Sequence, residues 1–124
     1  MNKQEFDAVM KLPSVRRYEH FVKVVADWEV IWGLYNDGWA SGEDDEGNTL
    51  LPLWPKKEYA EFFAKDDWSA FTPKEIDLNE FMTEWLPDME RDKIQPSIFW
   101  NGTDSIVPTI DRLLHDLSGE LDKY

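Results

Sequence analysis

The sequence predicts a single α+β domain over residues 1–124, with a mainly antiparallel sheet of about four to five strands and helices packed on it. The length of 124 residues fits one domain. Hydrophobic residues make up 42% of the chain and aromatic residues 15%, enough apolar surface for one core. Strand-like segments joined by short polar turns favour antiparallel pairing, and helical patterns stand at both ends of the chain.

The N-terminal segment predicts a helical hairpin. Residues 2–5 have the spacing of a capping box, and Pro13 ends the short helix that follows. Ser14 is placed to cap a second helix, which continues to Trp28. Its apolar stripe consists of Val15, Tyr18, Phe21, Val22, Val25 and Trp28.

Three strands are expected next. Residues 30–35 are apolar on both parities, which predicts a strand buried on both faces. An Asn-Asp-Gly turn leads into a second strand over residues 39–41, and residues 42–48 form a polar loop. Residues 49–54 predict the third strand, in which Pro52 indicates an edge or a bulge.

A helical region follows these strands. Pro55 suits the first turn of a short helix, and residues 66–74 read as a loop. Residues 77–80 form another capping box and begin the clearest helical stripe in the chain. That stripe consists of Leu78, Phe81, Met82, Trp85, Leu86 and Met89.

The C-terminal part predicts one more strand and one more helix. Residues 94–100 alternate as a strand does, and an Asn-Gly turn then lets residues 105–107 pair back briefly. A last amphipathic helix begins near Ile110 and stops near Gly119. Hairpin-type links argue against a doubly wound parallel fold.

Charge and composition restrict the possible functions. The formal net charge is -13; residues 1–26 hold five basic and three acidic side chains, and the remainder holds 8 and 23. Such a surface repels phosphate backbones, so no nucleic acid is expected as a partner, whereas a basic protein is favoured. No cysteine, leader-like segment or apolar run long enough for a membrane is present, which predicts a cytoplasmic protein with no membrane contact. No cofactor or metal is expected.

Several short runs resemble one small bacterial family, the one catalogued as domain of unknown function 2750. The runs are Val30-Ile31-Trp32-Gly33-Leu34, Asp37-Gly38-Trp39-Ala40, Leu51-Pro52-Leu53-Trp54-Pro55 with Tyr59-Ala60, Trp68, Ile76-Asp77-Leu78 with Phe81, and Leu86-Pro87. The likeness extends from about Arg17 to Pro108. It implies a small stand-alone bacterial α+β protein, but no activity and no catalytic residues.

Tryptophan side chains form the first candidate site. Trp32, Trp39 and Trp54 fall on adjacent expected strands, and Trp68 follows in a loop. They form either an aromatic groove for a peptide or a sugar ring, or ordinary core packing, which is the commoner use of aromatic residues in a small domain. If any tryptophan is exposed, Trp39 or Trp68 is the expected one, because these two lie nearest to loops.

Charged segments supply two further candidates. Glu43, Asp44 and Asp45 are consecutive rather than alternate, which favours a solvated turn over a calcium loop. Arg16 and Arg17, with Lys23, are expected on the exposed face of the second helix. There they either bind an acidic partner or remain a solvated face.

A non-enzymatic protein-interaction domain, of an immunity or inhibitor type, is the leading functional hypothesis. It depends on the acidic body and on the lack of a phosphate loop, a nucleophile elbow or a zinc-binding histidine pair. The alternative is a small enzyme or ligand-binding domain with a Trp-lined pocket. The chain is expected to be a monomer, or a homodimer built on the strand at residues 94–100.

Overall fold

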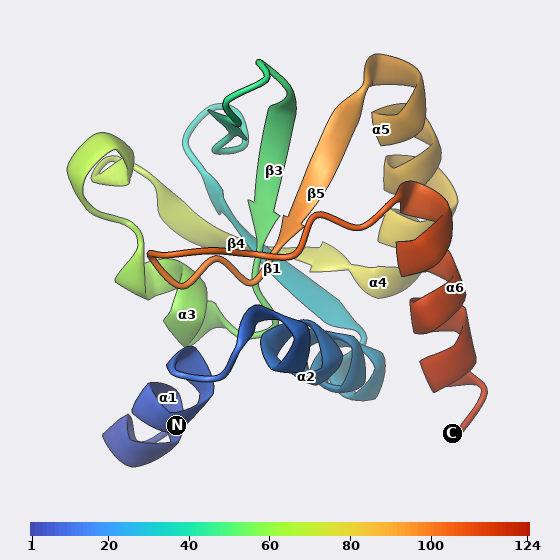
Figure 1. Cartoon of the computed structure of the whole chain (residues 1–124), viewed down its shortest axis with the longest axis horizontal. Helices are drawn as coiled ribbons and strands as arrows, with labels where there is room; N and C mark the ends of the chain where they lie inside the picture. Colours follow the sequence, from blue (N-terminus) through green and yellow to red (C-terminus); the bar gives the residue numbers. More distant parts are fainter.

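The computed structural model describes residues 1–124 and has a mixed α/β architecture (Figure 1). It begins with the expected helical hairpin, α1 (Lys3–Met10) and α2 (Ser14–Trp28). The Asn2 side chain accepts a hydrogen bond from the Glu5 N–H at 2.8 Å, so the first predicted cap is confirmed. The cap expected from Ser14 is absent: Pro13 occupies the N-cap position of α2, and no side chain caps this helix.

Five strands form two small sheets rather than one. β1 (Val30–Tyr35) pairs antiparallel with β4 (Thr72–Asp77). In the second sheet, β3 (Thr49–Leu53) lies between β2 (Gly42–Glu43) and β5 (Ile94–Ile98). β2 runs antiparallel to β3, but β5 runs parallel to it, because the long helical connection allows a crossover. The α+β class is therefore correct in outline, while the expectation of one mainly antiparallel sheet is not.

One backbone bridge joins the two sheets. Trp32 in β1 and Trp54, directly after β3, exchange two N–H···O bonds of 2.9 and 2.8 Å. The Leu53 carbonyl accepts the Phe99 N–H on the opposite side of the chain. The backbone N–H and C=O groups of successive strand residues point to alternate sides, so those of Pro52 point to the same side as those of Trp54. On that side β2 pairs with β3 only as far as Leu50, two residues before Pro52. Pro52 therefore lies in the central strand, at a position where β3 has no partner on the side of the proline nitrogen, so no ladder bond is lost. The predicted edge or bulge is thus a local edge, and β3 as a whole is not an edge strand.

Two local predictions are corrected. The strand expected over residues 39–41 is reduced to an isolated bridge between Tyr35 and Trp39, and β2 begins only at Gly42. The loop expected over residues 66–74 contains the turn η1 (Asp66–Trp68) and the start of β4. β4 escapes detection because Ile76 is its only buried residue, so it lacks an alternating apolar pattern.

The remaining elements are close to those expected, except that Pro55 precedes the N-cap Lys56 and so lies outside the first turn of the next helix, where it was expected. α3 (Lys57–Phe62) comes before β4, and α4 (Leu78–Glu80), η2 (Phe81–Trp85) and α5 (Leu86–Asp92) form one continuous helix. The Asp77 carboxylate accepts the Glu80 N–H at 3.0 Å, which confirms Asp77 as the predicted cap of this helix. Ile98 and Ile106 form the short return pairing. α6 (Ile110–Leu121) continues two residues beyond Gly119.

Aromatic side chains form the centre of the core. Trp54, Tyr59, Phe21, Phe81 and Phe99 are all fully buried. In Figure 1, β3 and β5 run side by side, with α5 beside β5; α2 packs on α6. This arrangement leaves one face of β3 toward α5 and the other toward α3 and η1.

Arg17 is buried, contrary to the prediction of an exposed basic face. Its side chain is only 1% exposed. It donates to the backbone carbonyls of Leu12, Phe99 and Asp104 and forms an ion pair with the Asp104 carboxylate. These partners are up to 87 residues away in the sequence, so helical spacing alone gives no sign of them. Arg17 therefore fastens α2 to the segment after β5 and is not available to a partner.

Candidate functional site

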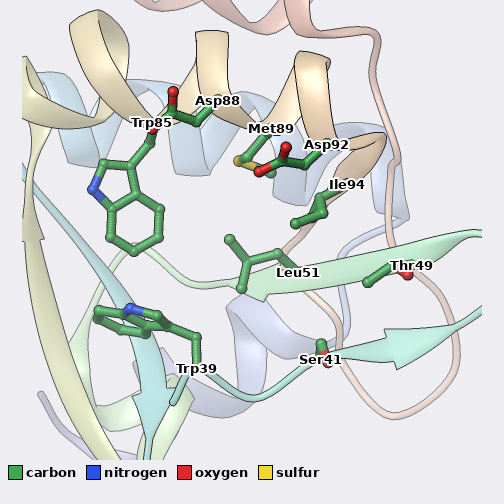
Figure 2. Close-up of a pocket in the computed structure, with 9 residues that line it drawn as sticks. All are labelled: Trp39, Ser41, Thr49, Leu51, Trp85, Asp88, Met89, Asp92 and Ile94. Carbon is green, nitrogen blue, oxygen red and sulfur yellow. The ribbon is translucent and has the colours of Figure 1, made fainter.

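A cavity of about 350 Å³ opens between α5 and one face of the three-stranded sheet (Figure 2). We call it the tryptophan groove. Trp39 and Trp85 face each other at one end, with ring centroids 5.1 Å apart and planes at 77°. This edge-to-face geometry is a favourable one for aromatic pairs. The nine lining residues are Trp39, Ser41, Thr49, Leu51, Trp85, Asp88, Met89, Asp92 and Ile94.

Trp39 is fixed in the groove by the surface of β1. Its ring lies over Gly33, where an added Cβ would come within 3.0 Å of the Trp39 Cε3 atom. The Tyr35 ring meets Trp39 edge-on at 5.1 Å, and the Lys74 ammonium lies 4.0 Å from the Tyr35 ring centroid and 5.6 Å from that of Trp39. Trp39 thus rests on glycine on one side and presents its remaining surface to the groove.

Trp85 reaches the groove because of a π-helical turn. The Leu86 N–H bonds to the Phe81 carbonyl, five residues back. Pro87 explains the irregularity: it has no N–H to donate, and in a regular α-helix its ring would clash with the carbonyl four residues earlier. Buried Phe81 and Leu86 are accordingly five residues apart, and Trp85 is left half-buried at the edge of the core.

Two carboxylates line the α5 side of the groove. Asp88 and Asp92 are one helical turn apart and exposed, and Figure 2 shows both on the helix above the cavity. Arg91 lies 3.2 Å from an oxygen of each. The hydrogen bond from Arg91 to Asp92, together with both negative charges, raises the pKa of Arg91. Arg91 thus offsets the repulsion between the two like charges, and both carboxylates remain exposed to solvent.

The groove therefore combines three kinds of surface. Leu51, Met89 and Ile94 provide an apolar floor, the two tryptophans provide aromatic faces, and the aspartates provide negative charge. A long cationic side chain matches this combination, because its methylene stem packs on apolar surface while its charge remains near carboxylates or over an aromatic ring.

The predicted aromatic residues are separated by the fold. Trp39 lines the tryptophan groove, whereas Trp68 lines a different hollow. Both are half-buried, and the most exposed tryptophan is Trp28, at 63%. The exposure prediction was therefore wrong. Trp28 is the last residue of α2. The Lys56 ammonium lies 4.8 Å from the centroid of the Trp28 ring.

Hydrogen bonds within the acidic loop at residues 43–48 fix its conformation. The Asp44 carboxylate accepts the Glu46 N–H at 2.9 Å, and the backbone and side-chain N–H groups of Asn48 at 2.8 and 2.9 Å. The bonds from Asn48 and Glu46 lower the pKa of Asp44. Glu43 and Asp45 are exposed. No group of three or more acidic or histidine side chains in the protein is arranged to hold a metal ion.

The predicted basic residues divide between surface and interior. Arg16 is exposed and lies 3.6 Å from Glu19, one helical turn away, while Arg17 is buried as described above. The two arginines therefore form no common site with each other or with the groove.

Sequence reasoning missed the α5 side of the groove. Trp85 and Met89 appear in the sequence only as members of an apolar helical stripe, and Asp88 and Asp92 are two of 26 acidic residues. The available signal was Pro87, which stands inside a strong helical pattern and predicts an irregular turn there.

Gly33→Ala is expected to disturb the groove from below. The new Cβ would lie 3.0 and 3.1 Å from two Trp39 ring atoms, so Trp39 must move. Trp85 and Tyr35 pack against Trp39 and resist this movement, so we expect a loss of about 1 kcal/mol of unfolding free energy, the lower end of the range for overpacking. Urea denaturation measures that loss, and the indole N–H resonance of Trp39 reports the displacement. Gly119→Ala is the control, because nothing lies within 4 Å of its added Cβ; an equal loss in both variants would contradict the close contact.

Comparisons with known proteins agree with the resemblance seen in the sequence. No helix in the structure is long and apolar enough to cross a bilayer. Comparison with the curated proteins gives no match. The model of the family described as "Protein of unknown function (DUF2750)" matches residues 18–117, a range that includes every residue of the tryptophan groove. The chain therefore belongs to the DUF2750 family.

Proposed function

We propose that this protein is a non-enzymatic interaction domain that binds a basic segment of another protein in the tryptophan groove. The observation that carries the proposal is the meeting of Trp39 and Trp85 with Asp88 and Asp92 around one open cavity. Aromatic and carboxylate groups together are suited to a lysine or arginine side chain.

Net charge supports a basic partner. The chain carries a formal charge of -13, so its field attracts positively charged proteins and increases their association rate. The negative groups of the groove remain next to solvent, where they can act on an approaching partner. An immunity- or inhibitor-type role fits this picture, since an acidic domain of this kind covers a basic functional surface.

Groove shape favours a polypeptide over a small substrate. Asp88, Asp92 and Ser41 are all exposed at the rim, so the cavity is open along one side rather than closed around a ligand. Its floor includes Met89, and methionine is common at surfaces that accommodate varied side chains. A side chain projecting from a partner enters such a groove without the partner itself being enclosed.

Removing the two groove carboxylates should weaken binding without weakening the fold. The double variant Asp88→Asn/Asp92→Asn is expected to bind a basic peptide at least about fivefold less tightly, since about 1 kcal/mol of lost attraction gives that factor. Its unfolding free energy should change by no more than about 0.5 kcal/mol, because both side chains are on the surface.

Fluorescence anisotropy of a labelled peptide of alternating lysine and valine tests this proposal. Glu58→Gln/Glu61→Gln on α3 is the matched control, because it removes the same charge from two exposed positions outside the groove lining. The proposal predicts weaker binding at high salt, and a loss specific to the α5 variant. Equal affinity for both variants, no peptide binding at all, or equally tight binding of free arginine amide would contradict it.

A further inference from the structure

A second hollow lies next to the tryptophan groove and has a similar composition. It has a volume of about 390 Å³ and is lined by Ser41, Gly42, Phe63, Lys65, Asp66, Asp67, Trp68 and Trp100. We call it the Trp68 hollow. Like the groove, it brings two tryptophans together with two aspartates. Ser41 is the one residue that lines both cavities.

The two cavities lie on opposite faces of the three-stranded sheet. Thr49 and Leu51 of β3 line the tryptophan groove. Trp54, which has the opposite parity, stacks on Phe63 at 5.7 Å and meets Trp68 edge-on at 6.4 Å, on the side of the Trp68 hollow. Because successive strand residues point to opposite faces, the sheet separates the two cavities, which meet only at its β2 edge.

That edge has unpaired backbone groups. β2 pairs with β3 on one side only. The Asp44 N–H donates to Asn48 across the hairpin, so Gly42, two residues earlier, also faces β3, while Ser41 and Glu43 face away. The Ser41 N–H and carbonyl have no hydrogen-bond partner in the protein, and both Ser41 and Glu43 are exposed. An open strand edge of this kind is a template for an added strand.

We propose that the bound segment is an extended strand that pairs with the free edge of β2 and places basic side chains in both cavities. This inference rests on the proposed function and specifies the form of its ligand. Adjacent residues of a strand point to opposite faces, so two neighbouring basic residues reach the tryptophan groove and the Trp68 hollow respectively. Residues separated by one position point to the same face and reach only one cavity.

The surrounding charge selects for a basic strand and against a second copy of this chain. Glu43 lies on the edge itself, and Asp45 and Glu46 follow it in an exposed loop. Pairing of two such edges would bring these acids together, and like charges on paired strands are unfavourable. A basic segment instead gains attraction along the whole edge.

Three synthetic peptides test the spacing directly. Each contains eight residues, with two arginines in an otherwise identical serine–valine background, and is acetylated and amidated. In the first the arginines are adjacent, in the second they are separated by one residue, and the third is the first with N-methyl groups at the backbone positions that would face β2. Calorimetric titration with the full-length protein gives their affinities.

The adjacent-arginine peptide is expected to bind at least about fivefold more tightly than the separated one, because it alone uses both cavities. N-methylation should remove this advantage, since it blocks the backbone hydrogen bonds of an added strand. Asp66→Asn/Asp67→Asn should reduce the preference for adjacent arginines to less than about twofold, while Glu58→Gln/Glu61→Gln should leave it intact.

The possible negative results distinguish the strand inference from the proposed function. Equal binding of the first two peptides, with both still sensitive to Asp88→Asn/Asp92→Asn, would overturn the strand inference and leave the proposed function standing. Retained affinity of the N-methylated peptide would overturn it as well. No binding of any peptide would overturn the proposed function itself. A concentration-dependent dimer that excludes the peptides would show that a second copy occupies the edge, which also contradicts the inference.

Discussion

Arg17→Met is expected to lower the unfolding free energy by about 3–5 kcal/mol, because it leaves several carbonyl oxygens around the buried guanidinium without their donor, at about 1–3 kcal/mol for each buried group left unsatisfied. The Arg17 guanidinium is the only charged group among the largest fully buried side chains. Its removal leaves the carbonyls of Leu12 and Phe99 without their donor and releases Asp104. Methionine preserves most of the volume, so the loss measures the polar contacts rather than a cavity.

Neighbouring Arg16 provides the control for Arg17. Arg16→Met removes the same charge from the same helix, but its side chain is exposed and contacts only Glu19, so we expect a change within about 0.5 kcal/mol. Arg17→Lys should recover little, because an ammonium cannot reproduce the planar fork that reaches several acceptors. Urea denaturation curves of the three variants measure these changes in unfolding free energy. Equal stability of the Arg16 and Arg17 variants would show that the buried network contributes nothing.

Trp54→Ala is expected to cost about 3–5 kcal/mol of unfolding free energy, the usual range for removing a buried tryptophan. Trp54 is fully buried, stacks on Phe63, and donates its indole N–H to the Trp100 carbonyl at 2.9 Å. Its backbone also forms the bridge to Trp32 that joins the two sheets. The loss should therefore appear as lower stability and as weaker packing between the sheets.

Trp28→Ala is the matched control for Trp54. It removes the same side chain from a site that is 63% exposed, with Lys56 as its aromatic–cation partner. A loss of no more than about 1 kcal/mol is expected there. Comparable losses at the two positions, measured by chemical denaturation, would contradict the central role of Trp54 in the core.

Much of the fold could be predicted from local patterns. Capping residues Asn2 and Asp77, the apolar run of β1 and the stripe of α6 all gave elements that the structure contains. The family-specific Leu-Pro-Leu-Trp-Pro run proves to be structural, since it provides the central strand and the bridge at Trp54. The elements that the sequence did not predict depend on tertiary contacts. The residues of β4 are mostly polar, and β4 is a strand because it pairs with β1.

The candidate site could be predicted only in part. Trp39 was identified as a candidate because it follows a turn, but its partners Trp85 and Asp88 come from a helix more than 40 residues later. Helical periodicity includes Trp85 in the apolar stripe but gives no sign of the π-helical turn next to Pro87, where Trp85 is half-buried at the margin of the core. Arg17 illustrates the opposite error, because a basic residue on the polar face of a helix is normally exposed unless distant carbonyls surround it.

The indole N–H signals of the seven tryptophans test most directly whether the tryptophan groove is the binding site. Each tryptophan gives one such resonance in a nitrogen–proton correlation spectrum, so a titration with the adjacent-arginine peptide surveys seven positions at once. Trp39 and Trp85 in the groove should shift together with Trp68 and Trp100 in the Trp68 hollow, while Trp28, which lines neither cavity, remains in place. Binding that shifts Trp28 and leaves Trp39 and Trp85 unchanged would contradict the proposed site.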